Sequence, residues 1–184
     1  MTKTWFAVIA LVGLTSLAQP NPLALRAGEL LTNARAKLHA EGWHADPTAH
    51  AATGDYTGLD RQLAHAEYFE VDYCSVGKSF CVLQYTKDKA CLRLHTQGEE
   101  IRSMRIERWS NDCREKGTNE GENLLPADVR YVTQWRNECE DYEQCKGADG
   151  FLLTLKKKYA RSAVIMKVLS SNDNPVEIYP TTKK

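Results

Sequence analysis

Hydrophobic and polar residues alternate with a period of two through much of the segment from Tyr68 to Trp109. Four stretches of this segment are rich in aromatic and β-branched residues, and short polar turns separate them. These stretches are residues 68–73, 80–86, 90–96 and 101–109. In the last stretch Met104 and Ile106 share one face, and the opposite face carries Arg105, Glu107 and Trp109. The pattern predicts a four-stranded antiparallel β-meander with one covered face and one face open to solvent.

An N-terminal helix is predicted over residues 24–41, which are rich in alanine, leucine, arginine and lysine, and Gly42 is placed to end it. Its apolar positions recur at helical spacing at Leu31, Ala34 and Leu38. A shorter helix is expected at residues 59–66, with a simple turn as the alternative. The first helix is the natural cover for the apolar face of the meander. In topology alone, this arrangement resembles the modules of bacterial periplasmic inhibitors of the β-lactamase-inhibitor type.

The C-terminal third begins with a polar connector at residues 114–125, after which Pro126 opens a second helix. The apolar stripe of that helix is Val129, Val132, Trp135, Cys139 and Tyr142. Gly147 is placed to terminate the helix. Residues 151–169 fit a helix by composition, but their cleaner alternation favours a β-hairpin. A short final strand is expected at residues 176–179, between two prolines.

Together these elements predict an α+β fold. An N-terminal helix packs on the four-stranded antiparallel β-meander, and a second helix and a C-terminal β-hairpin (or helix) follow. We expect residues 19–113 to hold the first helix and the meander. Residues 114–184 then add the second helix and the C-terminal strands to the same globular domain, which is long enough to bury a substantial core.

The N-terminus has the pattern of a signal peptide. Lys3 precedes an apolar run from Trp5 to Leu14, which is much shorter than the roughly 20 residues of a membrane-spanning helix. The small residues Ser16 and Ala18 predict cleavage after Ala18, with a later cut near Ala24 or Ala27 as the alternative. We therefore expect residues 1–18 to be removed, and a periplasmic or secreted product without a membrane span. No Asn-x-Ser/Thr acceptor for glycosylation occurs, which favours a bacterial source.

Cysteine usage agrees with export. All the cysteines lie after the predicted signal peptide: Cys74, Cys81, Cys91, Cys113, Cys139 and Cys145. An even number in an exported chain predicts a disulfide framework. Sequence proximity favours Cys74 with Cys81 and Cys139 with Cys145, which leaves Cys91 for Cys113. No pair has the close spacing of a zinc site, so we expect no metal.

The charge of the chain excludes one class of partner. The 24 basic residues balance the 24 acidic residues, whereas phosphate binding requires a surplus of positive charge on one face. We therefore expect no nucleic acid partner. Acidic residues gather in 138–143, arginines in 102–108 and lysines in 156–158, and solvated faces are the simplest interpretation of these clusters.

Motifs for catalysis or cofactor binding are incomplete. Residues 77–79 (Gly-Lys-Ser) match the end of a phosphate-binding loop, but Asp72 stands where that motif requires glycine. The histidines lack the spacing of a metal site. His44 and Asp46 are candidates for a base and its orienting carboxylate, although no third member accompanies them. We expect no catalytic residue and no cofactor.

The open face of the meander is the better functional candidate. Arginine and tryptophan dominate binding hot spots, and several such residues lie on or near this face or its edge. The candidates are Arg93, His95, Arg102, Arg105, Arg108 and Trp109. The alternative is that the C-terminal half packs there and buries Trp109.

These features favour an exported, soluble, non-catalytic protein-binding domain of the periplasmic inhibitor or immunity type. Its partner would be another exported or envelope protein with an acidic surface. Two alternatives stay open, namely a small exported hydrolase with a histidine–carboxylate site and a structural component of the cell envelope.

Overall fold

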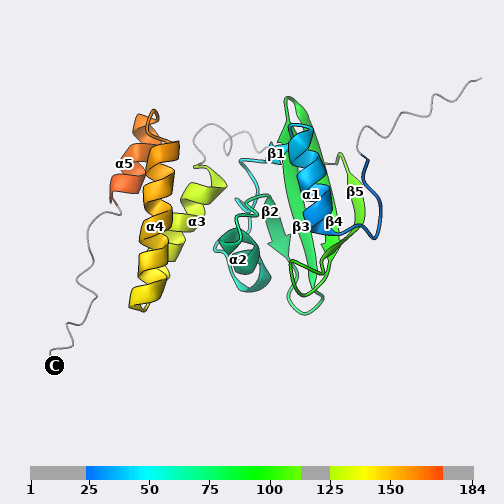
Figure 1. The fold of residues 1–184 in the computed structure, drawn as a ribbon, viewed down its shortest axis with the longest axis horizontal. Coiled ribbons are helices and arrows are strands. Elements are labelled where there is room, and N and C mark those ends of the chain that lie inside the picture. The colour runs from blue at the N-terminus through cyan, green and yellow to red at the C-terminus, as the bar shows by residue number, and fades with distance from the viewer. Residues whose placement is uncertain (1–23, 113–124, 172–184) are drawn as a thin grey trace, which may run out of the picture.

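A computed structural model describes residues 24–112 and 125–171. Its strands are β1 (His44–Ala45), β2 (Val71–Cys74), β3 (Phe80–Lys87), β4 (Ala90–Gln97) and β5 (Arg105–Ser110). Its helices are α1 (Leu31–Ala40), α2 (Gly58–His65), α3 (Ala127–Glu138), α4 (Tyr142–Lys158) and α5 (Ala163–Ser171). The strands form one antiparallel sheet, and α1 lies over one face of it (Figure 1). The predicted α+β class with an antiparallel sheet is confirmed.

The sheet is centred on β3. Strand β4 pairs along one side of β3, and β5 pairs with the far side of β4. The other side of β3 is shared, because β1 pairs at Tyr85 and Thr86 while β2 pairs from Cys81 to Leu83. The four strands of the predicted meander are therefore present and antiparallel. Strand β1 was not predicted, because two residues are too few to show a period.

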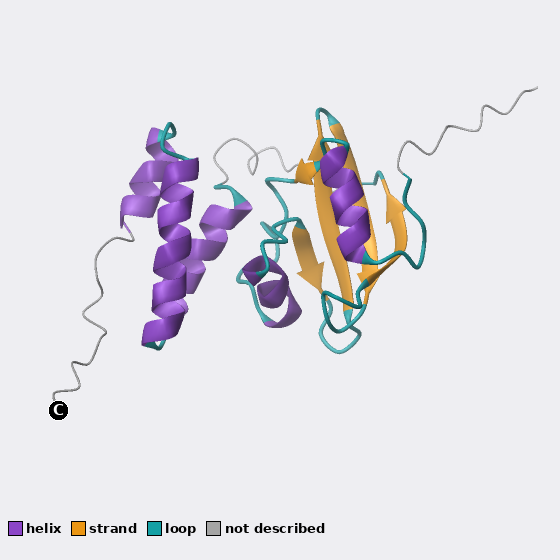
Figure 2. Cartoon of the chain, in the orientation of Figure 1, coloured by secondary structure: helices purple, strands orange, loops and turns teal. Residues whose placement is uncertain are grey.

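Helix α1 covers the inner face of the sheet, as Figure 2 shows. Leu31, Ala34 and Leu38 are fully buried in one core with the inward-facing residues of the strands. These strand residues are Leu83, Tyr85, Leu92, Leu94 and Ile106. The helix is shorter at its start than predicted, because residues 28–31 run beside β5: the Gly28 backbone N–H donates to the Ile106 carbonyl at 2.7 Å.

A β-bulge changes the register between β4 and β5. Thr96 pairs with Ile106, but the preceding residue of β4, His95, pairs with Arg108. Residue 107 is therefore the extra residue on the bulged strand. Beyond it Trp109 lies opposite the inward-facing Leu94 and packs against the core under α1. The expectation that Trp109 shares the open face is wrong, because strict alternation does not allow for the extra residue.

Helices α3, α4 and α5 pack on one another at the end of the molecule away from β5 (Figure 1). Their apolar cluster consists of Val129, Val132, Leu152, Leu155 and Leu169. Helix α3 also contacts the first half of the chain, because the Gln134 amide donates to the Tyr56 carbonyl at 3.0 Å and accepts from the Tyr56 backbone N–H at 2.8 Å. Tyr131 of α3 belongs to the core under the sheet.

Residues 151–158 lie in α4 and residues 163–169 lie in α5, with a turn between them. The expected C-terminal hairpin is therefore wrong, and the helical alternative is right. The buried residues of α4 are Cys145, Ala148, Leu152 and Leu155, which recur every three or four residues and face α3. Leu153, by contrast, is 60% exposed, although it is as hydrophobic as its neighbours. Packing of one helical stripe against α3 therefore overrides the alternation of residue types.

Pro126 precedes the first residue of α3 as predicted, but the helix ends at Glu138 rather than near Gly147. The next helix begins after Asp141, whose carboxylate accepts the Gln144 backbone N–H at 2.8 Å. Gly147 lies inside α4, where an added Cβ would stand 3.0 Å from the Trp135 ring. This glycine thus allows α3 and α4 to approach closely and does not end a helix.

Two predicted disulfides are present, Cys74–Cys81 and Cys139–Cys145. The first joins β2 to β3, and the second spans the break between α3 and α4. No cysteine is free in the part of the chain that the structure describes. The expected pairing of Cys91 with Cys113 lies outside the described residues, as do the predicted signal peptide, nearly all of the 114–125 connector and the final strand.

Candidate functional site

The outer face of β4 and β5, opposite α1, carries three arginines and a histidine. On β4, Arg93, His95 and Gln97 are alternate residues and share this face. Gln97 pairs with Arg105, and His95 pairs with Arg108. The β-bulge therefore puts Arg105 and Arg108 on the same face, although a spacing of three would separate them in a regular strand. We call the set Arg93, His95, Arg105 and Arg108 the cationic face.

The positive charge of this face comes from its arginines. Arg105 and Arg108 are exposed, and the Arg105 guanidinium donates to the Gly28 carbonyl at 2.7 Å. His95 is only 7% exposed. Burial lowers the pKa of His95, the charges of Arg108 and Arg93 lower it further, and the charge of Glu107 opposes this shift. The imidazole is therefore mainly neutral at pH 7, and it adds little charge or exposed area to the face.

Phe80 adds an aromatic surface next to His95. Its ring is half-buried and lies 5.7 Å from the imidazole ring, centroid to centroid. The predicted site did not include Phe80. Its position could have been predicted from the sequence. Phe80 and Gln84 are separated by an even number of positions in one strand, so both side chains lie on the outer face.

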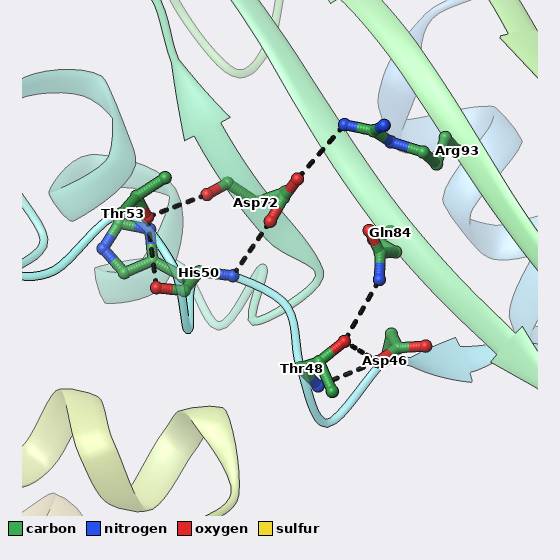
Figure 3. Close-up of polar contacts among 7 residues, drawn as sticks. All are labelled: Asp46, Thr48, His50, Thr53, Asp72, Gln84 and Arg93. Atoms are coloured by element: carbon green, nitrogen blue, oxygen red, sulfur yellow. Dashed lines mark hydrogen bonds and ion pairs between the residues drawn. The ribbon is translucent and has the colours of Figure 1, made fainter. Parts of the chain in front are cut away.

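Arg93 is held by a buried carboxylate. The Arg93 guanidinium donates to Asp72 Oδ2 at 3.3 Å, and Asp72 Oδ1 accepts the His50 backbone N–H, also at 3.3 Å (Figure 3). The Thr53 hydroxyl donates to the backbone carbonyls of Asp72 and His50 at 3.1 Å each. These bonds fix Arg93 at the border of the cationic face.

The segment that follows β1, residues 46–53, is hydrogen-bonded to β3 on the outer face of the sheet. The Gln84 amide donates to the Thr48 hydroxyl at 3.2 Å, and the Asp46 backbone N–H donates to the Gln84 carbonyl at 2.9 Å. Asp46 Oδ1 in turn accepts the Thr48 backbone N–H and hydroxyl at 2.8 and 2.6 Å (Figure 3). The outer face is thus divided, because residues 46–53 lie over β2 and β3 while β4 and β5 carry the cationic face.

A second buried carboxylate lies behind this network. Asp60, in the first turn of α2, is 8% exposed, and its Oδ1 atom has no hydrogen-bond partner within residues 24–112 and 125–171. Burial raises the pKa of Asp60 to about 6; a backbone hydrogen bond from Cys74 opposes this rise, and the Asp72 charge adds to it. The charge on Asp72 thus acts on Arg93 and on Asp60 together.

The two remaining predicted site residues lie apart from the cationic face. Arg102 precedes β5, is exposed, and pairs with Glu100 at 2.5 Å. Trp109 faces the core, as described above. The structure therefore brings together Arg93, His95, Arg105 and Arg108.

A separate charged cleft of about 410 Å³ opens between α1, β1 and the ends of α3 and α4. One wall carries the ion pair of Arg35 with Glu70. Glu70 is 1% exposed, and its carboxylate also accepts a hydrogen bond from the Tyr85 hydroxyl at 3.0 Å. The opposite wall carries Lys158, which pairs with Asp128 at 2.6 Å. The charges of the cleft are therefore largely paired within the protein.

His44 and Asp46 both line this cleft, together with His39. The Asp46 carboxylate already accepts the two hydrogen bonds from Thr48, and no hydrogen bond joins it to His44 in the described part of the chain. Burial lowers the pKa of His39, and the nearby Arg35 lowers it further. No group of three histidine, cysteine or acidic side chains suited to a metal ion occurs among the described residues.

Comparison with known proteins gives no family: no family model matches the chain, and neither a curated protein nor a solved structure matches it. No helix in the described ranges is long and apolar enough to span a membrane.

Proposed function

We propose that this chain is an exported, non-catalytic protein-binding domain whose cationic face holds an acidic surface of another exported or envelope protein. A periplasmic inhibitor or immunity-type protein is the form of such a domain that we favour. The observation that carries the proposal is the register of β4 and β5, which places Arg105 and Arg108 beside Arg93 and His95. Arginine is enriched among the residues that dominate protein interfaces.

The cationic face is organised before a partner arrives. Arg93 is fixed by Asp72, and Arg105 is held by the Gly28 carbonyl. The Cys74–Cys81 disulfide joins the neighbouring strands. A rigid surface loses less conformational freedom on binding than a mobile one, which favours affinity. Complementary charge also accelerates encounter with an acidic partner.

The disulfides indicate an oxidising compartment. We further infer that the protein resides in the periplasm or the medium after removal of residues 1–18. The intact mass of the protein recovered from that compartment tests this step. A chain beginning at Gln19 supports it, and a chain that retains residues 1–18 contradicts it.

Site-specific photo-crosslinking tests the binding role. A photoreactive amino acid is placed at Arg108 in the exported protein, and a second variant carries it at Lys78, which is exposed in the turn between β2 and β3. We expect one discrete adduct from position 108 that Arg105→Glu suppresses, and no such adduct from position 78. Equal adducts from both positions, or none from position 108, would contradict the proposal.

A small exported hydrolase is the second candidate, because His44 and Asp46 line one cleft of suitable volume for a small substrate. Its test is hydrolysis of chromogenic ester, phosphate and glycoside substrates by the wild-type protein and by His44→Ala. An activity that disappears in the folded variant would support this candidate. An activity that survives His44→Ala, or no activity at all, would dismiss this site.

A further inference from the structure

Positive charge is concentrated in the last described part of the chain. Residues 151–171 contain five basic residues and no acidic residue, whereas the whole chain has equal numbers of both. The five are Lys156, Lys157, Lys158, Arg161 and Lys167. Lys157, Arg161 and Lys167 are exposed, and no ion pair involving them is found within the described residues. Lys158 differs, because it pairs with Asp128.

The same segment exposes apolar side chains. Helix α5 is mostly apolar, yet Leu169 is its only buried residue. Val164 of α5 is 72% exposed, and Leu153 of α4 is 60% exposed. Single exposed apolar residues are ordinary, but here two of them accompany a helix whose apolar residues are mostly left partly open to solvent. Basic and apolar groups therefore occur together on α4 and α5.

Helix electrostatics account for only part of this arrangement. Lys156, Lys157 and Lys158 occupy the last turn of α4, where positive charge stabilises the helix dipole. Arg161 lies after that helix, and Lys167 lies in α5, which has no basic residue in its last turn. The dipole also gives no reason for the exposure of Val164.

We propose that α4 and α5 bind the surface of an anionic lipid bilayer. Basic side chains meet the phosphate groups of the lipid heads, and apolar side chains of the same helices enter the boundary between heads and acyl chains. The exposed apolar residues favour a bilayer over nucleic acid, which offers no apolar layer. In Figure 1 these helices and β5 lie at opposite ends of the molecule. Membrane contact therefore leaves the cationic face free, and this inference does not rest on the proposed function.

Co-sedimentation with vesicles tests this inference. The probes are vesicles of phosphatidylglycerol with phosphatidylethanolamine and vesicles of phosphatidylcholine alone. The basic variant is Lys157→Gln with Lys167→Gln, and its matched control is Lys78→Gln with Lys89→Gln, two exposed lysines around β3. Each basic residue near an anionic membrane strengthens binding about fivefold, so we expect the first pair of changes to weaken binding about 25-fold. The control pair leaves binding unchanged.

The apolar contribution has its own matched pair. Val164→Ser should weaken binding to the anionic vesicles, whereas Val76→Ser, at a still more exposed valine in the turn before β3, should not. Circular dichroism confirms that each variant is folded. Residues 5–14 are apolar, so the measurement is made on protein whose N-terminus has been determined by mass, with and without residues 1–18.

Several results would overturn the membrane assignment. One is wild-type protein that does not sediment with anionic vesicles or that sediments equally with phosphatidylcholine. Another is equal weakening by the two lysine pairs, which would show attraction by overall charge alone. A third is binding that depends on residues 1–18 and is untouched by changes in α4 and α5. Capture of an acidic protein through Lys157 and Lys167 in the absence of vesicle binding would assign this surface to a protein partner instead.

Discussion

Replacing Asp60 by asparagine should stabilise the protein at neutral pH. Asp60 is buried in the first turn of α2, close enough to Asp72 for the two carboxylates to repel. Asparagine has nearly the same shape and keeps an oxygen that can accept the Cys74 backbone hydrogen bond, but it carries no charge. The change therefore removes the cost of burying one of two neighbouring negative charges.

The size of the effect follows from the pKa of Asp60, which burial raises from 3.8 to about 6. A folded-state pKa above the unfolded value means that the folded chain binds the proton more tightly. The free energy of unfolding of the wild-type protein therefore falls as pH rises from about 4 to about 6 and levels off above that. A shift of about two pKa units corresponds to about 3 kcal/mol, which is the upper limit of the gain in Asp60→Asn at pH 8.

Urea unfolding monitored by circular dichroism at pH 4, 6 and 8 measures this gain. We expect the difference between Asp60→Asn and wild type to be close to zero at pH 4 and to reach about 2–3 kcal/mol at pH 8. Asp55→Asn, an exposed acid in the loop before α2, is the matched control and should change stability by less than about 0.5 kcal/mol at each pH. A difference that does not vary with pH, or a loss of stability at pH 8, would refute the placement of a buried charge at Asp60.

Two further predictions concern packing and covalent links. Gly147→Ala should destabilise the protein by about 1–3 kcal/mol, because the new Cβ meets the Trp135 ring. Gly150 lies three residues further along the same helix with open space around it, so Gly150→Ala should stabilise the protein by about 0.5–1 kcal/mol. Thermal unfolding of both variants decides this, and equal shifts in the same direction would be inconsistent with the close contact of α3 and α4. Replacing Cys74 and Cys81 together by alanine should lower the free energy of unfolding by about 2–3 kcal/mol, as expected for a loop of this length; urea unfolding with an unchanged midpoint would argue against this contribution.

The meander could be predicted from sequence because its residues obey two rules at once. Val, Phe, Tyr, Leu and Ile gather in short runs, and inward positions such as Leu92 and Leu94 alternate with polar ones. Strand β1 could not be predicted, because it exists only through pairing with Tyr85 and Thr86. The hairpin preferred for residues 151–169 was wrong for a different reason: exposed Leu153 and Val164 are hydrophobic like their buried neighbours, so residue type alone did not mark the buried stripe of a helix.

The candidate site was partly predictable. Alternation correctly placed Arg93, His95 and Arg105 on the outer face. The β-bulge decides which face Arg108 and Trp109 occupy. A bulge arises from the pairing of two strands, so it could not be predicted from the sequence of β4 or β5 alone. The contact between Arg93 and Asp72 was also beyond sequence, because it joins strands that are separated by β3.

The role of the cationic face is tested most directly by titration of the partner captured at position 108. Its affinity is measured for the wild-type protein, for Arg105→Glu with Arg108→Glu, and for the control Lys78→Glu with Lys89→Glu, which makes the same change in net charge on other exposed residues. We expect reversal of the two arginines to weaken binding about 30-fold or more, the loss that marks a binding hot spot, while the control stays close to wild type. Equal affinity for the wild type and the arginine variant would contradict the assignment of this face as the binding surface.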